Sequence, residues 1–112
     1  MKLDCNGDEM LLALVSMIQV TRPSLLKPAG DGFDVDVAPL LAQKDLNDDE
    51  RLVLRLYGIF SAASESARFT VDLTTAECQR LARALAVVES SRQWPADAVA
   101  LSRALAARLR SS

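Results

Sequence analysis

The chain has 112 residues, of which half are hydrophobic and a quarter are charged, and its formal net charge is −2 with a pI near 5.0. A chain of this length is too short for two ordinary domains, and its composition is that of a globular protein and not of a disordered one. Its weak acidity gives no overall field that would draw it to nucleic acid or to anionic lipid. We therefore expect one globular domain over residues 1–112.

Three segments alternate apolar and polar residues in the manner of half-buried strands. Residues 33–37 and 69–73 each place three apolar side chains on one face, and residues 2–5 show a shorter form of the pattern. The apolar faces of the two longer segments match in length and phase. We therefore expect residues 33–37 to pair with residues 69–73 in a small sheet.

Helices account for the rest of the chain, and two of their predicted starts carry a capping box. Asn6 is followed three residues later by Glu9, and Thr74 is followed three residues later by Glu77. Proline and glycine residues interrupt the pattern between residues 21 and 32, where we expect a loop. The predicted helices span residues 8–20, 38–44, 48–63, 75–91 and 95–110.

These elements predict a mainly α fold, a small domain of four to five helices with a minor two- or three-stranded β element at one edge. An all-α bundle is the alternative if the short alternating segments do not pair. The predicted core includes an apolar line along the helix at 75–91, formed by Cys78, Leu81, Leu85 and Val88.

The first predicted helix is hydrophobic around nearly its whole circumference, because eight of the nine residues from Met10 to Ile18 are apolar. A helix at the surface of a small domain normally keeps one polar flank. Another chain is therefore expected to cover part of this helix. We expect Met10, Leu14 and Met17 to form this contact, either with a different protein or with a second copy of the chain in a two-fold dimer.

Catalytic and metal-binding patterns are scarce in this sequence. Without histidine the chain offers no imidazole base and no Ser-His-Asp or Cys-His pair, and it has no glycine-rich phosphate loop. Asp34 and Asp36 are the best carboxylate pair, because residues two apart on a strand point to the same side about 6.5 Å apart. We interpret them as the solvated face of the strand, and we interpret Asp45, Asn47 and Asp49 as a helix start that lacks the glycine of a calcium loop. We expect no bound metal and no cofactor.

Arginines and one tryptophan remain as candidate binding residues in the C-terminal part of the chain. Arg80 and Arg83 are neighbours on one predicted helix face, and Arg103 lies on the next helix, two turns from Arg110. We interpret these arginines first as a solvated helix face. As a binding surface they suit an acidic protein better than nucleic acid, since the chain is acidic overall and has no nucleic-acid-binding motif. Trp94 is either an exposed binding anchor or a lid over the end of the helix pair.

The cysteines and the N-terminal residues indicate a cellular setting. Cys5 and Cys78 are too few for a disulfide framework and suit a reducing compartment as small apolar side chains. The first nine residues are acidic before the apolar run, unlike a signal peptide, and that run is about half the length of a membrane span. We expect a cytoplasmic protein without a membrane segment.

Three functions remain compatible with these observations. The first is a non-enzymatic protein–protein interaction module, such as an inhibitor, an immunity or antitoxin-like protein, an adaptor or a small subunit of a complex. The second is a histidine-free enzyme or small-ligand binder centred on Asp34 and Asp36. The third is a nucleic-acid-associated regulator that uses the arginine-rich C-terminal helix hairpin. The first fits best, because the chain has a core of its own and few groups suited to catalysis, and we expect its partner to be another protein.

Overall fold

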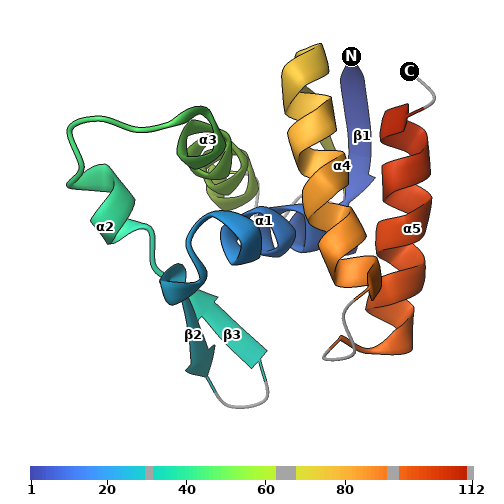
Figure 1. Ribbon diagram of the computed structural model, residues 1–112, viewed down its shortest axis with the longest axis horizontal. Helices are drawn as coiled ribbons and strands as arrows, with labels where there is room; N and C mark the ends of the chain where they lie inside the picture. The colour runs from blue at the N-terminus through green and yellow to red at the C-terminus, as the bar shows by residue number, and fades with distance from the viewer. Residues whose placement is uncertain (30–31, 63–67, 91–93, 111–112) are drawn as a thin grey trace.

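The computed structural model describes the chain except for residues 30–31, 63–67, 91–93 and 111–112 (Figure 1). The described part is mainly helical with two small antiparallel sheets, so the predicted mainly α fold with a minor β part is confirmed. The elements in chain order are β1 (Lys2–Asn6), α1 (Gly7–Thr21), the 3₁₀ helix η1 (Pro23–Leu25), β2 (Leu26–Ala29), β3 (Gly32–Val35), α2 (Ala38–Leu41), α3 (Asp48–Ala62), β4 (Arg68–Asp72), α4 (Thr75–Ser90) and α5 (Ala96–Arg110).

The capping boxes form as predicted. At the start of α1 the backbone N–H of Glu9 donates to the Asn6 side chain at 2.8 Å, and Glu9 Oε1 accepts from the Asn6 backbone N–H at 2.9 Å. Thr74 and Glu77 exchange the equivalent pair of hydrogen bonds at the start of α4. These bonds satisfy backbone donors that a helix cannot satisfy internally, and they fix where each helix begins.

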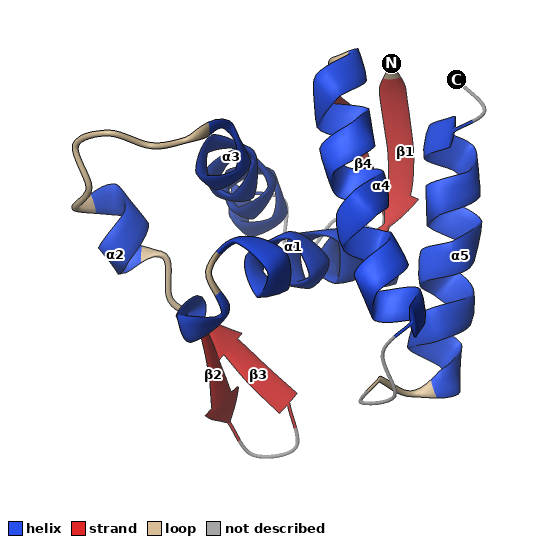
Figure 2. Cartoon of the chain, in the orientation of Figure 1, coloured by secondary structure: helices blue, strands red, loops and turns tan. Residues whose placement is uncertain are grey.

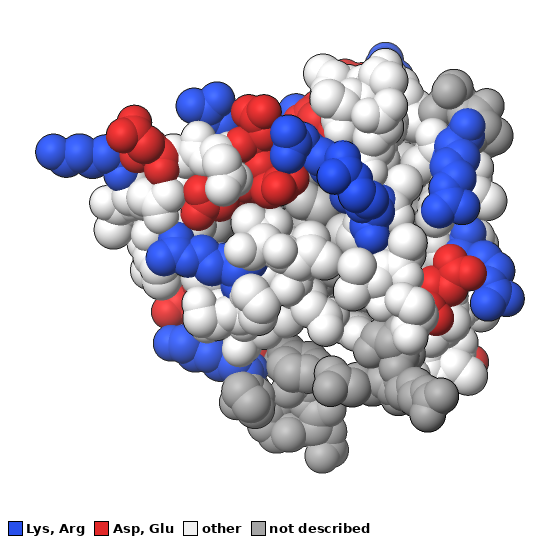
Figure 3. Space-filling view, in the orientation of Figure 1, with Lys and Arg blue, Asp and Glu red and all other residues white. Residues whose placement is uncertain are grey.

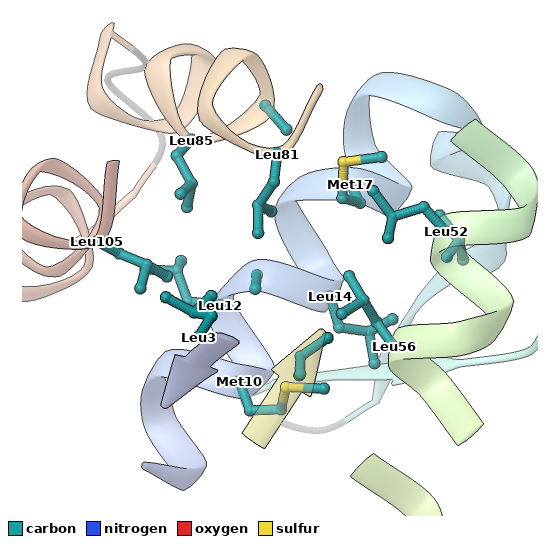
Figure 4. Close-up of a cluster of buried hydrophobic side chains, with 14 of the residues drawn as sticks. Leu3, Met10, Leu12, Leu14, Met17, Leu52, Leu56, Leu81, Leu85 and Leu105 are labelled. Atoms are coloured by element: carbon teal, nitrogen blue, oxygen red, sulfur yellow. The ribbon is translucent and has the colours of Figure 1, made fainter. Parts of the chain in front are cut away.

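α1 is the central element of the core. It packs between α3 and α4 and also contacts α5 and the β1–β4 sheet (Figure 1). In the close-up of Figure 4, Leu14 and Met17 lie on the side of α1 that faces α3. Leu12 lies on another side, toward Leu105 of α5. The apolar character all around α1 is therefore explained largely by the neighbours that its own chain provides.

The strands pair differently from the prediction. β1 pairs with β4, so that Leu3 lies opposite Val71 and Cys5 lies opposite Phe69. β3 pairs with β2, its neighbour in sequence, and forms a separate hairpin (Figure 2). The expected pairing of residues 33–37 with residues 69–73 is therefore wrong.

Chain connectivity and matched burial explain the observed pairing. β2 and β3 are separated by two residues, so their pairing closes a much shorter loop than pairing β3 with β4 would, and it costs less chain entropy. β1 and β4 both alternate exposed and buried residues along their length. Their buried faces therefore join the same core when the two strands lie side by side.

Two further boundaries differ from the prediction. The segment between residues 21 and 32, expected as a loop, contains η1 and β2. Pro23 occupies the first position of η1, where its missing N–H is not needed, and Pro28 is tolerated in β2 because both strands of a two-stranded hairpin are edges. The short helix expected at residues 38–44 ends at Leu41.

α4 and α5 form an antiparallel pair that is open at one end. The two helices diverge toward the C-terminal end of α5 (Figures 1 and 2). In the part of the chain that the structure describes, no helix is both long enough and apolar enough to cross a bilayer.

Candidate functional site

An open apolar groove lies between α1 and α5. Its volume is about 330 Å³. The lining residues are Asp8, Leu11, Leu12 and Val15 of α1, Val35 of β3, Trp94, and Ala98 and Leu101 of α5. Asp8 carries the charge in this lining, and the other side chains are apolar or aromatic. We call this feature the α1–α5 groove.

The helical repeat of α1 places its groove residues in one row. Asp8, Leu11 and Val15 follow one another at spacings of three and four residues, which lie on the same helix face. Leu11 is 44% exposed at the rim, whereas Leu12 and Val15 are each 6% exposed. The groove is thus a place where the apolar core reaches the surface.

Trp94 forms one wall of the groove. Its indole Nε1–H donates to Gln19 Oε1 at 3.2 Å, which ties the segment before α5 to the C-terminal half of α1. The ring is partly buried against the core and also faces the groove. Trp94 therefore packs against the core and also presents an aromatic surface to the groove.

The rim of the groove is acidic. Asp8 lines the groove, and Asp97 lies four residues before Leu101 on the same flank of α5. Both carboxylates are exposed, and neither has an ion-pair partner among the described residues. Glu9, by contrast, is held by Arg108 at 2.7 Å. The groove therefore offers uncompensated negative charge beside an apolar surface.

The residues predicted to bind a partner through α1 lie elsewhere. Met10, Leu14 and Met17 are at most 1% exposed, because α3, α4 and the β1–β4 sheet cover them. They cannot touch another protein while the domain is folded, so this part of the prediction is wrong. Leu11 is the large apolar residue of the same stretch that remains at the surface.

The arginines predicted as a binding surface are divided among separate contacts. Arg80 donates to Asp49 at 2.7 Å across α3 and α4, and it also lies 3.4 Å from Asp48. Arg103 pairs with Glu89 at 3.0 Å. Figure 3 shows basic and acidic side chains side by side over α3 and α4, and not one continuous basic surface on this face. Among the described residues, Arg83 is the member of the predicted set without an ion-pair partner.

Asp34 and Asp36 do not converge on the groove. Asp36 lies just beyond the last residue of β3, accepts from the Ala38 backbone N–H at 3.1 Å and is 3.3 Å from Lys27 Nζ. The Ala38 hydrogen bond, helped by Lys27, lowers the pKa of Asp36. Asp36 therefore serves to start α2, while Asp34 is exposed on β3. Within the described ranges, no three His, Cys, Asp or Glu side chains gather as a metal site would require.

The sequence patterns missed the residues that define the groove. Leu11 stands within a run of apolar residues, so that nothing local distinguishes it from its buried neighbours. Ala98 and Leu101 lie far from α1 in the sequence, and Val35 was expected to pair with residues 69–73. Their convergence depends on the angle at which α5 crosses α1 and on the position of the β2–β3 hairpin.

Comparison with known proteins adds no family to this description. No protein-family model matches the chain, and neither the curated proteins nor the solved structures contain a match.

Proposed function

We propose that this chain is a non-enzymatic protein-binding module, and that its α1–α5 groove accepts an apolar helix of another protein. The observation that carries the proposal is the groove itself, which is open to solvent and apolar along most of its lining. Apolar surface in water gains free energy when another apolar surface covers it. Amphipathic helices dock in such grooves through side chains three and four residues apart.

The charge at the rim narrows the choice of partner. Asp8 and Asp97 offer exposed carboxylates beside the apolar lining. A docked helix with Lys or Arg flanking its apolar row would complement these carboxylates. An acidic helix would be repelled by them. The occupant we propose is therefore a basic amphipathic helix.

The size of the groove supports a helix more than a second copy of this chain. A volume of about 330 Å³ takes a few side chains of one helix, whereas a second copy of the chain would need a wider apolar surface around the groove, about 800 Å² on each partner in a standard interface. Other exposed large apolar residues do not extend the groove. Leu41 belongs to α2, and Val20 and Val87 line a separate hollow.

Site-specific photo-cross-linking tests the proposal. A photoreactive phenylalanine analogue replaces Leu11 in one variant and Val87 in another, because both side chains are 44% exposed and only Leu11 lines the groove. We expect the Leu11 position to capture one protein and the Val87 position not to capture it. Peptide mapping should place the cross-link in an apolar helix of that partner. Asp8→Lys should reduce the capture of the partner from the Leu11 position.

Two results would contradict the proposal. Capture from Val87 but not from Leu11 would move the binding surface to α4. Capture of a second copy of this chain from Leu11 would make the protein a homodimer through the groove. An inhibitor, an immunity or antitoxin-like protein, an adaptor and a small subunit all fit the proposed function, and the identity of the captured protein separates them.

A cytoplasmic location is part of this proposal. Cys5 and Cys78 are both free and buried, which fits a compartment that keeps thiols reduced. Cell fractionation beside a cytoplasmic marker protein tests it, and recovery of the chain from another compartment would contradict it.

A further inference from the structure

A second hollow lies at the open end of the α4–α5 pair, away from the α1–α5 groove. Its volume is about 720 Å³. The lining residues are Met1, Thr75, Cys78, Gln79, Ala82, Arg83, Ala86, Leu109 and Arg110. The two helices diverge here (Figure 1), and Met1, which precedes β1, lines the hollow together with residues of both helices. We call this feature the α4–α5 hollow.

Two arginines at the hollow stand out by their lack of partners. Arg83 and Arg110 are exposed, and neither makes a hydrogen bond or an ion pair with any residue that the structure describes. Most other arginines of the described chain lie within 3.9 Å of a carboxylate. These are Arg22, Arg51, Arg55, Arg80, Arg103 and Arg108. Arg83 and Arg110, which have no carboxylate partner among the described residues, therefore line the same hollow.

The rest of the hollow is mainly apolar. Met1, Ala82, Ala86 and Leu109 contribute hydrocarbon surface, and the Cys78 Sγ lies 3.5 Å from the Met1 sulfur. Thr75 and Gln79 add neutral polar groups. A guanidinium group donates several hydrogen bonds in one plane, which matches the oxygens of carboxylates, sulfonates and phosphates.

We propose that the α4–α5 hollow binds a small organic anion, with its acidic group on Arg83 and Arg110 and its apolar body against Ala82, Ala86 and Leu109. The volume lies within the range of roughly 300–1,000 Å³ that small-molecule sites occupy. Residues of α4 and α5 and Met1, which precedes β1, line the hollow, and it is partly open to solvent. A volume of this size holds one compact molecule, and an extended acidic peptide would run beyond the residues that line it.

Dye binding tests the charge requirement. The purified protein is titrated with anilinonaphthalene sulfonate and, separately, with phenylnaphthylamine, which has the same rings without the sulfonate. We expect the anionic dye to bind more tightly, and added salt to weaken its binding. Arg83→Gln and Arg110→Gln should each weaken the anionic dye by roughly tenfold, because each removes a charge-assisted hydrogen bond. Arg103→Gln is the matched control and should leave binding unchanged, because that arginine lies outside the hollow and pairs with Glu89.

Two further measurements locate the dye. Cys78 lines the hollow, so bound dye should slow its alkylation by iodoacetamide. Leu101→Ser alters the α1–α5 groove and should not affect binding of the anionic dye. Equal affinity for the two dyes, or unchanged binding in both Arg83→Gln and Arg110→Gln, would overturn the proposal. If only Leu101→Ser abolished binding of the anionic dye, the dye would bind in the α1–α5 groove, and this result would overturn the proposal as well.

Discussion

Glu50 is a buried charged residue that joins three parts of the chain. Its side chain is 8% exposed and accepts from the Asn47 backbone N–H at 3.1 Å, which caps α3. Gln43 Nε2 donates to both Glu50 carboxylate oxygens at 3.2 and 3.3 Å, and Arg22 Nη1 lies 3.4 Å from one of them. The carboxylate thus connects the end of α1, the α2–α3 connector and the start of α3.

Replacing this carboxylate should cost stability. We expect Glu50→Ala to lower the free energy of unfolding by about 2 kcal/mol, because it removes a buried carboxylate that accepts from Gln43, from the Asn47 backbone N–H and from Arg22. Glu89→Ala is the control, since Glu89 makes one partly exposed pair with Arg103 and its loss should cost about 0.5 kcal/mol or less. Urea unfolding curves of the two variants measure both values, and equal losses would show that the Glu50 contacts do not stabilise the fold.

Cys5 is predicted to be unreactive in the folded protein. It is 0% exposed, and burial raises its pKa from near 9 to about 11, with a smaller contribution from the nearby charge of Glu9. The reactive thiolate is therefore scarcer at pH 8 than in the unfolded chain, by on the order of 100-fold. We expect iodoacetamide at pH 8 to modify Cys78 before Cys5, and to modify both quickly in urea. Rapid modification of Cys5 without denaturant would show that β1 opens readily.

The same shift has a consequence for stability at high pH. The folded state holds the Cys5 proton more tightly than the unfolded state, because its pKa is higher when folded. This contribution is fully present below about pH 9 and is lost as the pH rises toward 11. Cys5→Ala should therefore lose less stability than the wild type over that pH interval.

At the scale of single elements, α1 has a covered side and an open side. Leu14 is 1% exposed and faces α3, whereas Leu11 is 44% exposed at the groove. We expect Leu14→Glu to unfold the domain, because an unpaired buried carboxylate costs several kcal/mol, comparable to the stability of a domain this size. Leu11→Glu should remain folded, with a melting temperature within a few degrees of the wild type.

Circular dichroism melting curves of the two variants test this assignment. The comparison is matched, because both changes replace a leucine of the same helix by the same residue. A folded Leu14→Glu protein would mean that the α3 side of α1 is open to water. An unfolded Leu11→Glu protein would mean that the groove is closed in solution.

The whole molecule is expected to unfold as one unit. One cluster of buried apolar residues draws on β1, α1, α3, β4, α4 and α5. The radius of gyration is 13.2 Å, equal to the roughly 13 Å expected for a compact single domain of this length. A contiguous core of this kind favours a cooperative, two-state transition.

Two probes of unfolding test the single-domain prediction. Trp94 fluorescence reports on the junction of α1 and α5, where the indole binds Gln19, and circular dichroism reports on all the helices. We expect the two thermal transitions to coincide. An earlier change in the fluorescence would show that α5 separates from α1 before the rest of the fold is lost.

The sequence by itself determined the local structure. Helix starts at Asn6 and Thr74 were predictable because each cap depends on residues three positions apart, whatever the rest of the chain does. The strand character of residues 69–72 was predictable for a similar reason, since period-two alternation is a local property of the chain. The mainly α fold follows from adding these local preferences together.

Only the tertiary structure decided which surfaces meet. The alternation in β4 does not predict whether β1 or β3 is its partner, because both strands offer an apolar face. The pairing is determined by the short loop that joins β3 to β2 and by the core that β1 and β4 share. The apolar run of α1 likewise does not predict which leucine remains exposed to solvent. Leu14 is buried and Leu11 is exposed because α3 packs on one side of α1 and α5 leaves the other partly open. Those contacts join residues far apart in sequence, so no short pattern contains them.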